Sequence, residues 1–213
     1  MVEEYIALGT APGISYLHRN ESTGEIHSWI YGTPGCSGCT SSIAISSNGN
    51  YIVAGTADGS NSRVYLFSMI SDIPIWSYTA GEDIRTVAIS DDGEYIAAGG
   101  NTNMVYLYSK DSGTPLWDYN TGDDVLSVSI SANGDPYIVA GTDNHGVHLF
   151  GHYQMMHDGT QWWHYNTNSR VTTTAISADG KYIVAGNENG LVILFDKDSA
   201  GYDGTPLWSY QAT

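Results

Sequence analysis

The tripeptide pattern Trp-x-Tyr occurs five times, and this repetition constrains the fold more than any other feature of the chain. The tryptophans stand roughly 45 residues apart, at Trp29, Trp76, Trp117, Trp163 and Trp208. A second marker, Tyr-Ile-(Ala/Val)-(Leu/Ala)-Gly, keeps the same period and begins at Tyr5, Tyr51, Tyr95, Tyr137 and Tyr182. Two independent markers with one period indicate five copies of a single structural unit.

Each full repeat contains four short segments with the composition of β-strands. Besides the two marked segments there is a run such as VYLF (residues 64–67) and a run that ends in Ile-Ser (residues 43–46). Enrichment in β-branched and aromatic residues, with glycine-containing turns between the runs, is typical of strands. Asn or Asp followed by Gly separates the Ile-Ser run from the Tyr-Ile run at Gly49, Gly93, Gly134 and Gly180. Because this dipeptide supplies the positive φ of a tight hairpin, we expect consecutive strands to be antiparallel neighbours.

The period and the strand count together predict an all-β fold, a β-propeller of five blade repeats. A single four-stranded unit exposes two apolar faces, so adjacent units must stack. A period of roughly 40 to 50 residues with four strands favours a propeller over an open β-solenoid. We expect one domain over residues 1–213, with repeats at approximately 1–40, 41–82, 83–123, 124–169 and 170–213. The five repeat-marking tryptophans are predicted to pack between blades at the wide rim.

One of the five repeats lacks one of its four strand segments. The Ile-Ser run occurs four times, whereas the other three segments occur five times, so one of the antiparallel blades should lack its innermost strand. The sequence leaves three explanations open for the resulting unpaired edge. The chain is part of a longer propeller, or the ring closes with a three-stranded blade, or another subunit donates a strand.

Residues 87–119 (VAISDDGEYIAAGGNTNMVYLYSKDSGTPLWDY) carry a resemblance to two known families. The string is similar to a WD-repeat blade, which has an inner strand, an Asp-Gly turn and a strand of small residues. Its ending KDSGTPLW resembles the tryptophan-docking stretch of quinoprotein-type (PQQ-type) propellers. The resemblance extends over essentially the whole chain and is closest to the regular repeats of archaeal and bacterial surface proteins. It therefore favours an extracellular or cell-surface location, with the cytoplasm as the alternative.

The charge balance excludes two classes of partner. The chain has 7 Lys and Arg against 23 Asp and Glu, for a formal net charge of −16. Nucleic acid and anionic lipid are bound through basic residues, so we expect neither as a partner. No stretch approaches the roughly 18 consecutive apolar residues of a membrane helix, so we expect no membrane insertion. Residues 1–9 lack the basic and apolar regions of a signal peptide.

The two cysteines, Cys36 and Cys39, lie in a connection rich in Gly and Pro. A structural zinc site needs about four ligands, and a thioredoxin-type motif is followed by a helix, whereas a strand is expected here. We therefore predict a short-loop disulfide. Free thiols are the alternative, and metal or redox chemistry is the third.

Histidines crowd the fourth repeat, at His145, His148, His152, His157 and His164. A cluster of this kind is compatible with a metal site. However, His148 stands where earlier repeats have Tyr65 and Tyr106, and His164 stands where others have serine. Both are therefore interpreted as variation of the repeat, and we predict no metal site.

The remaining motifs do not point to catalysis. Asp and Asn recur at turn positions in every repeat, which fits hairpin geometry better than a pair of glycosidase carboxylates. No nucleophile elbow, phosphate loop or zinc-protease motif is present. We predict no catalytic residue and no cofactor. Three unmatched aromatics near the longest loops, Tyr153, Trp162 and Tyr202, are candidates for stacking on a sugar, and Asn20 begins the sole N-glycosylation sequon.

These observations favour a non-enzymatic scaffold whose loop-rich faces bind another protein or other copies of the chain, since rigid blades with variable loops suit the presentation of surfaces. Two alternatives remain open. A lectin-like propeller predicts sugar binding through the loop aromatics, and a quinone- or metal-dependent enzyme predicts a bound cofactor.

Overall fold

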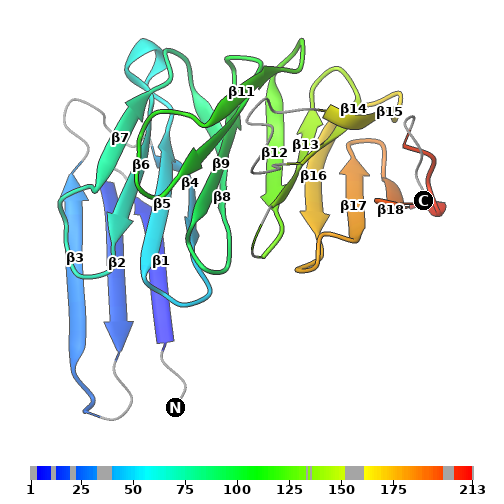
Figure 1. Cartoon of the computed structure of the whole chain (residues 1–213). Helices are drawn as coiled ribbons and strands as arrows, with labels where there is room; N and C mark the ends of the chain where they lie inside the picture. Colours follow the sequence, from blue (N-terminus) through cyan, green and yellow to red (C-terminus); the bar gives the residue numbers. More distant parts are fainter. Residues whose placement is uncertain are drawn as a thin grey trace.

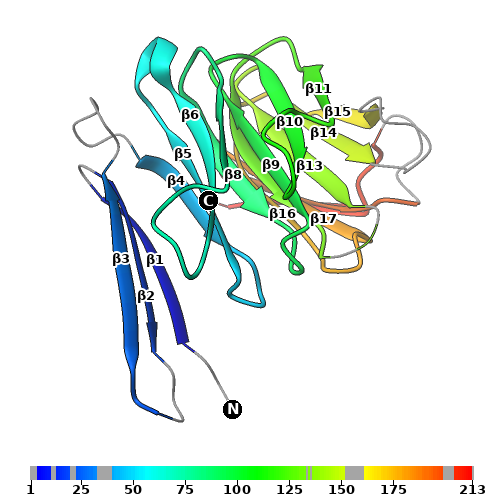
Figure 2. The same ribbon diagram turned by 60° about the vertical axis from the view of Figure 1, so that its left-hand side comes forward.

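A computed structural model describes residues 4–10, 13–19, 23–32, 40–132, 134, 136–151, 161–198 and 204–212 of the chain. These residues form five antiparallel sheets, which follow one another in chain order (Figures 1 and 2). We call them blades 1 to 5. Together with the repeats, they confirm the predicted five-blade β-propeller fold.

Blade 1 has three strands, and each of the other four blades has four, in the order in which they occur in the sequence. Blade 1 consists of β1 (Glu4–Thr10), β2 (Gly13–Arg19) and β3 (Ile26–Gly32). Blade 2 consists of β4 (Thr40–Ile45), β5 (Tyr51–Thr56), β6 (Arg63–Ser68) and β7 (Trp76–Thr79). Blade 3 consists of β8 (Ile84–Ile89), β9 (Tyr95–Gly100), β10 (Met104–Ser109) and β11 (Trp117–Asn120).

Blade 4 consists of β12 (Val125–Ile130), β13 (Tyr137–Thr142), β14 (Gly146–Gly151) and β15 (Gln161–Asn166). Blade 5 consists of β16 (Val171–Ile176), β17 (Tyr182–Asn187), β18 (Leu191–Asp196) and β19 (Trp208–Gln211). The helical structure that accompanies these strands is a short 3₁₀ turn, η1 (Gly59–Asn61), in blade 2. Over the described ranges, the chain forms no helix with the length and apolar character needed to cross a membrane.

The inner strands β4, β8, β12 and β16 lie side by side, and side-chain hydroxyls join each to the next. The backbone N–H of Val87 donates to Ser42 Oγ at 3.1 Å, and the N–H of Val128 donates to Thr86 Oγ1 at 3.1 Å. Each of these inner strands has an irregularity in its pairing register near its start, as between Thr40 and Ser42. Such bulges turn a side chain away from the ladder, which here places a hydroxyl toward the neighbouring blade.

The Asn-Gly and Asp-Gly dipeptides at residues 48–49, 92–93 and 179–180 form the hairpins that the sequence predicts. Gly93 has a φ of +79°, a conformation that favours glycine. Ser90 Oγ donates to Asp92 Oδ1 at 2.6 Å, and the same Asp92 oxygen accepts the N–H of Glu94 at 3.0 Å. The ring of Tyr51 from the preceding blade lies where a Cβ at Gly93 would stand, 2.4 Å from its nearest carbon. Asp92 is therefore part of the turn structure. At Gly49, Gly93 and Gly180 both the backbone and a tyrosine ring of the preceding blade require glycine.

The core is divided among the spaces between consecutive blades. Four clusters of buried residues lie there, one for each pair of neighbours from blades 1 and 2 to blades 4 and 5. Within the described residues, no comparable packing joins blade 5 to blade 1. The two end blades consequently present one sheet face each to solvent.

Candidate functional site

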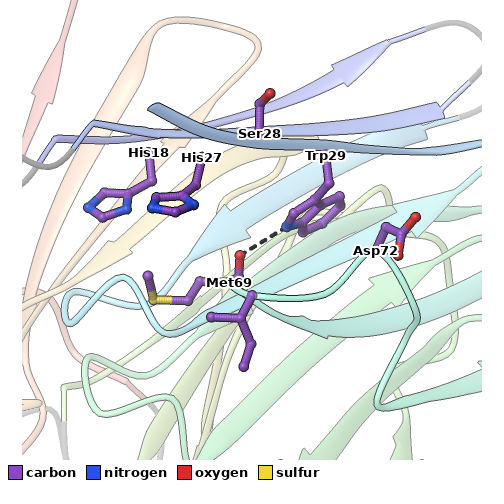
Figure 3. Close-up of a pocket in the computed structure, with 7 residues that line it drawn as sticks. His18, His27, Ser28, Trp29, Met69 and Asp72 are labelled. Atoms are coloured by element: carbon purple, nitrogen blue, oxygen red, sulfur yellow. Dashed lines mark hydrogen bonds between the residues drawn. The ribbon is translucent and has the colours of Figure 1, made fainter. Parts of the chain in front are cut away.

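A hollow of about 440 Å³ lies at the outer edge of the contact between blades 1 and 2. Strands β2 and β3 and the loop between β6 and β7 surround it, and its lining residues are His18, His27, Ser28, Trp29, Met69, Ile70 and Asp72. Figure 3 shows the two imidazoles side by side, with Trp29 next along the sheet and Asp72 beyond it. The hollow therefore combines an aromatic and aliphatic floor with two imidazoles and one carboxylate.

Cross-strand pairing places the two imidazoles together. His18 and His27 face each other in the register of β2 and β3, and their ring centroids are 6.1 Å apart. His18 is buried and also stacks on Tyr5, at a centroid distance of 4.8 Å, whereas His27 is exposed. A neutral imidazole carries one hydrogen-bond donor and one acceptor, so the exposed His27 can bind either a carbonyl or an amide of a ligand.

The tryptophan of this hollow joins blade 1 to blade 2. Trp29 Nε1 donates to the backbone carbonyl of Met69 at 3.0 Å, and the indole packs against Phe67 at a centroid distance of 5.2 Å. Trp76 makes the equivalent bond to the carbonyl of Lys110 in blade 3, at 2.9 Å. Through its own bond and its contact with Phe67, the Trp29 indole holds the two blades together, and its ring also lines the hollow.

The loop at residues 69–75 keeps the backbone geometry of the other blades but differs in its side chains. The Met69 N–H donates to the Asn50 carbonyl at 2.9 Å, as Lys110 and Lys197 donate to the equivalent carbonyls. Ile70 therefore corresponds to Asp111 and Asp198, and Ile73 corresponds to Thr114 and Thr205. Ile70 is 85% exposed and Ile73 is 72% exposed. Apolar side chains thus replace polar ones at two open positions beside the hollow.

We call residues 69–75, together with the lining residues of the hollow, the rim patch. The repeat markers do not identify it, because they consist of the residues that every repeat shares. The signal was present in the comparison of SMISDIPIW (residues 68–76) with SKDSGTPLW (residues 109–117). A residue that departs from its repeat, rather than one that keeps it, distinguishes one blade from the others.

The predicted blade-packing tryptophans occupy two kinds of environment. Trp29, Trp76, Trp117 and Trp163 each lie within 5.0 to 5.6 Å, centroid to centroid, of an aromatic ring in the following blade. Trp208 in β19 is 49% exposed. The indole that the first four pack against the next blade is therefore open to solvent in blade 5.

A second histidine pair lies in blade 4, where His148 and His164 are cross-strand partners with ring centroids 4.6 Å apart. His148 is buried, its Nδ1 lies 3.2 Å from Gln161 Oε1, and burial lowers its pKa to about 4. Burial also lowers the pKa of His164. In register, His148 occupies the position of Tyr65 and Tyr106. In the described ranges, no group of three or more His, Cys, Asp or Glu side chains is placed to hold a metal ion.

Several predicted site residues fall outside the described part of the chain: Cys36 and Cys39, Asn20, Tyr153, Tyr202, His152 and His157. Of the three loop aromatics, Trp162 is described. It is half-buried, meets Tyr137 edge-on at 5.1 Å and lies 5.5 Å from the Lys197 ammonium. The indole already packs against these two side chains within its own molecule.

Three segments of the chain match the WD40 family, described as WD domain, G-beta repeat: residues 28–62, 73–109 and 160–196. Together they cover just over half of the chain. No curated protein matches it. The matched segments begin at or near the outer strand of one blade and continue into the next, so the WD40 repeat is offset from the blades of the structure. The chain therefore belongs to the WD40 repeat family.

Proposed function

We propose that this protein is a non-enzymatic scaffold that binds a segment of a partner protein at the rim patch. WD40 repeats generally mediate protein–protein interaction, and propellers of this family are typically not enzymes. The observation that carries the proposal is the exposure of Ile70 and Ile73 at positions where the equivalent loops have Asp and Thr. Exposed apolar side chains grouped beside a hollow are characteristic of surfaces that bind other proteins.

The chemistry of the rim patch defines the kind of partner that fits it. Ile70, Met69 and Trp29 favour an apolar side chain inserted into the hollow. Asp72 on its lining and the net charge of −16 favour basic residues beside that anchor. We therefore propose a partner segment with one or two apolar anchors flanked by Lys or Arg.

A peptide-display selection tests this proposal. A random peptide library is selected on the native protein, and each enriched peptide is then measured on an I70D/I73T variant, which restores the residues of the equivalent blade. We expect enriched peptides with the apolar and basic pattern, whose affinity falls more than about tenfold on the variant, as for loss of an interface hot spot.

The matched control changes the equivalent positions of blade 3, in a D111S/T114S variant, which should bind the selected peptides as the native protein does. A selection that yields no peptides, or peptides that bind the native protein and the I70D/I73T variant equally, would contradict the rim patch as the binding surface.

We propose the cell exterior as the location of this scaffold. A surface poor in basic residues and the resemblance of the repeats to surface proteins support this location. Labelling of intact cells with an impermeant amine reagent checks it, because the exposed Lys181 reacts only if the protein lies outside the membrane. Absence of labelling in intact cells, with labelling after lysis, would place the protein inside.

A further inference from the structure

Consecutive blades in this chain pack through one recurring arrangement. The front face of a blade is the face turned toward the following blade, and in blade 2 it includes Val53, Val64, Leu66, Trp76 and Tyr78. The back face is turned toward the preceding blade, and in blade 3 it includes Ile96, Ala98, Tyr106 and Tyr108. These residues form a single buried cluster, so front against back is the contact that unites two blades.

The same contact is made four times. The tryptophan of the front face meets an aromatic ring of the next back face in the pairs Trp29–Phe67, Trp76–Tyr108, Trp117–Phe150 and Trp163–Phe195, at 5.2, 5.3, 5.6 and 5.0 Å between centroids. The front-face tyrosine two residues later meets the same ring each time, as Tyr165 meets Phe195 at 5.3 Å. A front face is thus complementary to a back face in a defined register.

Blade 5 has a complete front face that nothing covers in the described structure. Trp208 and Tyr210 occupy the positions of Trp163 and Tyr165, and Tyr182 and Val184 occupy those of Tyr137 and Val139. All four of these blade 5 side chains are exposed, whereas Trp163 and Val139 are buried. Blade 5 therefore presents the side chains that the other blades pack against their successors.

Blade 1 has the matching back face, which is also uncovered. Ile6 stands where blades 2 to 5 have Ile52, Ile96, Ile138 and Ile183, which are fully buried, yet Ile6 is 47% exposed. Leu8 and Leu17 are exposed on the same face, and a shallow hollow of about 210 Å³ opens between these residues and Ile30. Leu17 and Ser15 are smaller than the aromatic residues at their positions in blade 2, Phe67 and Tyr65, which leaves room for an indole or a phenol from another molecule.

From this complementarity we propose that copies of this protein associate head to tail, the front face of blade 5 in one copy packing on the back face of blade 1 in the next. Such an interface is heterologous, since two different surfaces meet, and it builds a ring or a filament rather than a two-fold dimer. The contact repeats the arrangement by which the chain's own blades pack, and it is separate from the rim patch and from the function proposed for it.

A second copy carries the complement of each uncovered face, a back face for blade 5 and a front face for blade 1. In the described structure the two end faces do not meet each other, so they are available to another molecule. A two-fold contact would place front against front, with the tryptophans of both copies opposed and no back face to receive them. Exposed apolar area of this kind on both ends of one molecule favours association in water.

Light scattering on three charge-matched variants tests the proposal. An I6E/L17E variant blocks the back face, a W208E/Y210E variant blocks the front face, and an S77E/T79E variant places the same charge on the exposed side of β7 in blade 2. All six positions are open or half-open to solvent, so the substitutions leave the buried core in place. The I70D/I73T variant, measured in parallel, separates this assembly from partner binding at the rim patch.

We expect the native protein, S77E/T79E and I70D/I73T to show masses above 23.0 kDa that rise with concentration. Each blocked variant alone should remain at 23.0 kDa. An equimolar mixture of the two blocked variants should form a species of two chains and nothing larger, because one intact front face and one intact back face remain.

Three results would overturn head-to-tail association. The native protein could stay at 23.0 kDa over the whole concentration range. This result would mean that the two faces pack on each other within one molecule or do not associate. One blocked variant could still self-associate, which would indicate a two-fold contact. The mixture could remain monomeric although the native protein assembles, which would place the interface elsewhere.

Discussion

His148 shows how one residue that departs from its repeat acquires a distinct chemistry. It stands on the back face of blade 4, at the position of Tyr65 and Tyr106, and is therefore enclosed by the packing of blades 3 and 4. Burial penalises the imidazolium form and lowers the pKa of His148 to about 4, against an ordinary value of 6.5. In the unfolded chain this histidine binds a proton below pH 6.5, whereas in the folded protein it does so only near pH 4.

This difference predicts an acid-sensitive stability. Between pH 6.5 and about 4 the unfolded state binds more protons, so the free energy of unfolding falls as the pH falls, by up to about 3 kcal/mol for this group. A His148→Tyr substitution, which restores the repeat residue, should flatten that slope when urea unfolding is measured at pH 7, 6, 5 and 4. Carboxylates titrate equally in both proteins and cancel in the difference. Identical slopes would mean that His148 is protonated in the folded protein.

At the scale of the strand, the outer strands β7, β11 and β19 have only four residues each, yet each carries the repeat-marking tryptophan. Strand β7 spans only Trp76–Thr79, yet Trp76 both packs on Tyr108 and donates to the Lys110 carbonyl. Strand β19 has the same length and sequence pattern, but Trp208 is exposed. The contribution of an outer strand to the free energy of unfolding therefore depends on whether a following blade packs against its tryptophan.

Trp76→Phe tests this dependence, because phenylalanine keeps the ring but cannot donate to the carbonyl. We expect a loss of about 1 to 3 kcal/mol in the free energy of unfolding, from the broken hydrogen bond and the smaller buried area. Trp208→Phe, measured at dilution, should change it by less than about 0.5 kcal/mol, as for other exposed positions. Equal losses in chemical denaturation would show that Trp208 is also buried against a neighbour.

For the whole molecule, the large acidic charge opposes the apolar attraction between copies. Two molecules with a net charge of −16 repel each other, and this repulsion is screened by salt. Head-to-tail association should therefore strengthen as salt rises from about 10 to 150 mM, since the screening length falls from about 30 to 8 Å. Sedimentation velocity at the two salt concentrations measures this, with the W208E/Y210E variant as the monomeric reference. Association that weakens with salt would instead indicate ion pairs across the interface.

The sequence alone determined the architecture, because a repeated strand pattern has few ways to bury its two apolar faces. The Trp-x-Tyr and Tyr-Ile markers predicted five antiparallel blades, the Asn-Gly and Asp-Gly turns predicted their hairpins, and the count of Ile-Ser runs predicted the three-stranded blade. All of these depend on local pattern, which neighbouring residues in the sequence specify.

Only the tertiary structure decided which copies of the repeat are buried and which are exposed. Trp163 and Trp208 belong to the same motif, and the difference between them is the blade that covers one and not the other. The rim patch likewise needs His18, Trp29 and Ile70 to meet across two blades. Burial is set by contacts between residues far apart in the chain, so equivalent sequence positions acquire different solvent exposure, pKa and binding capacity.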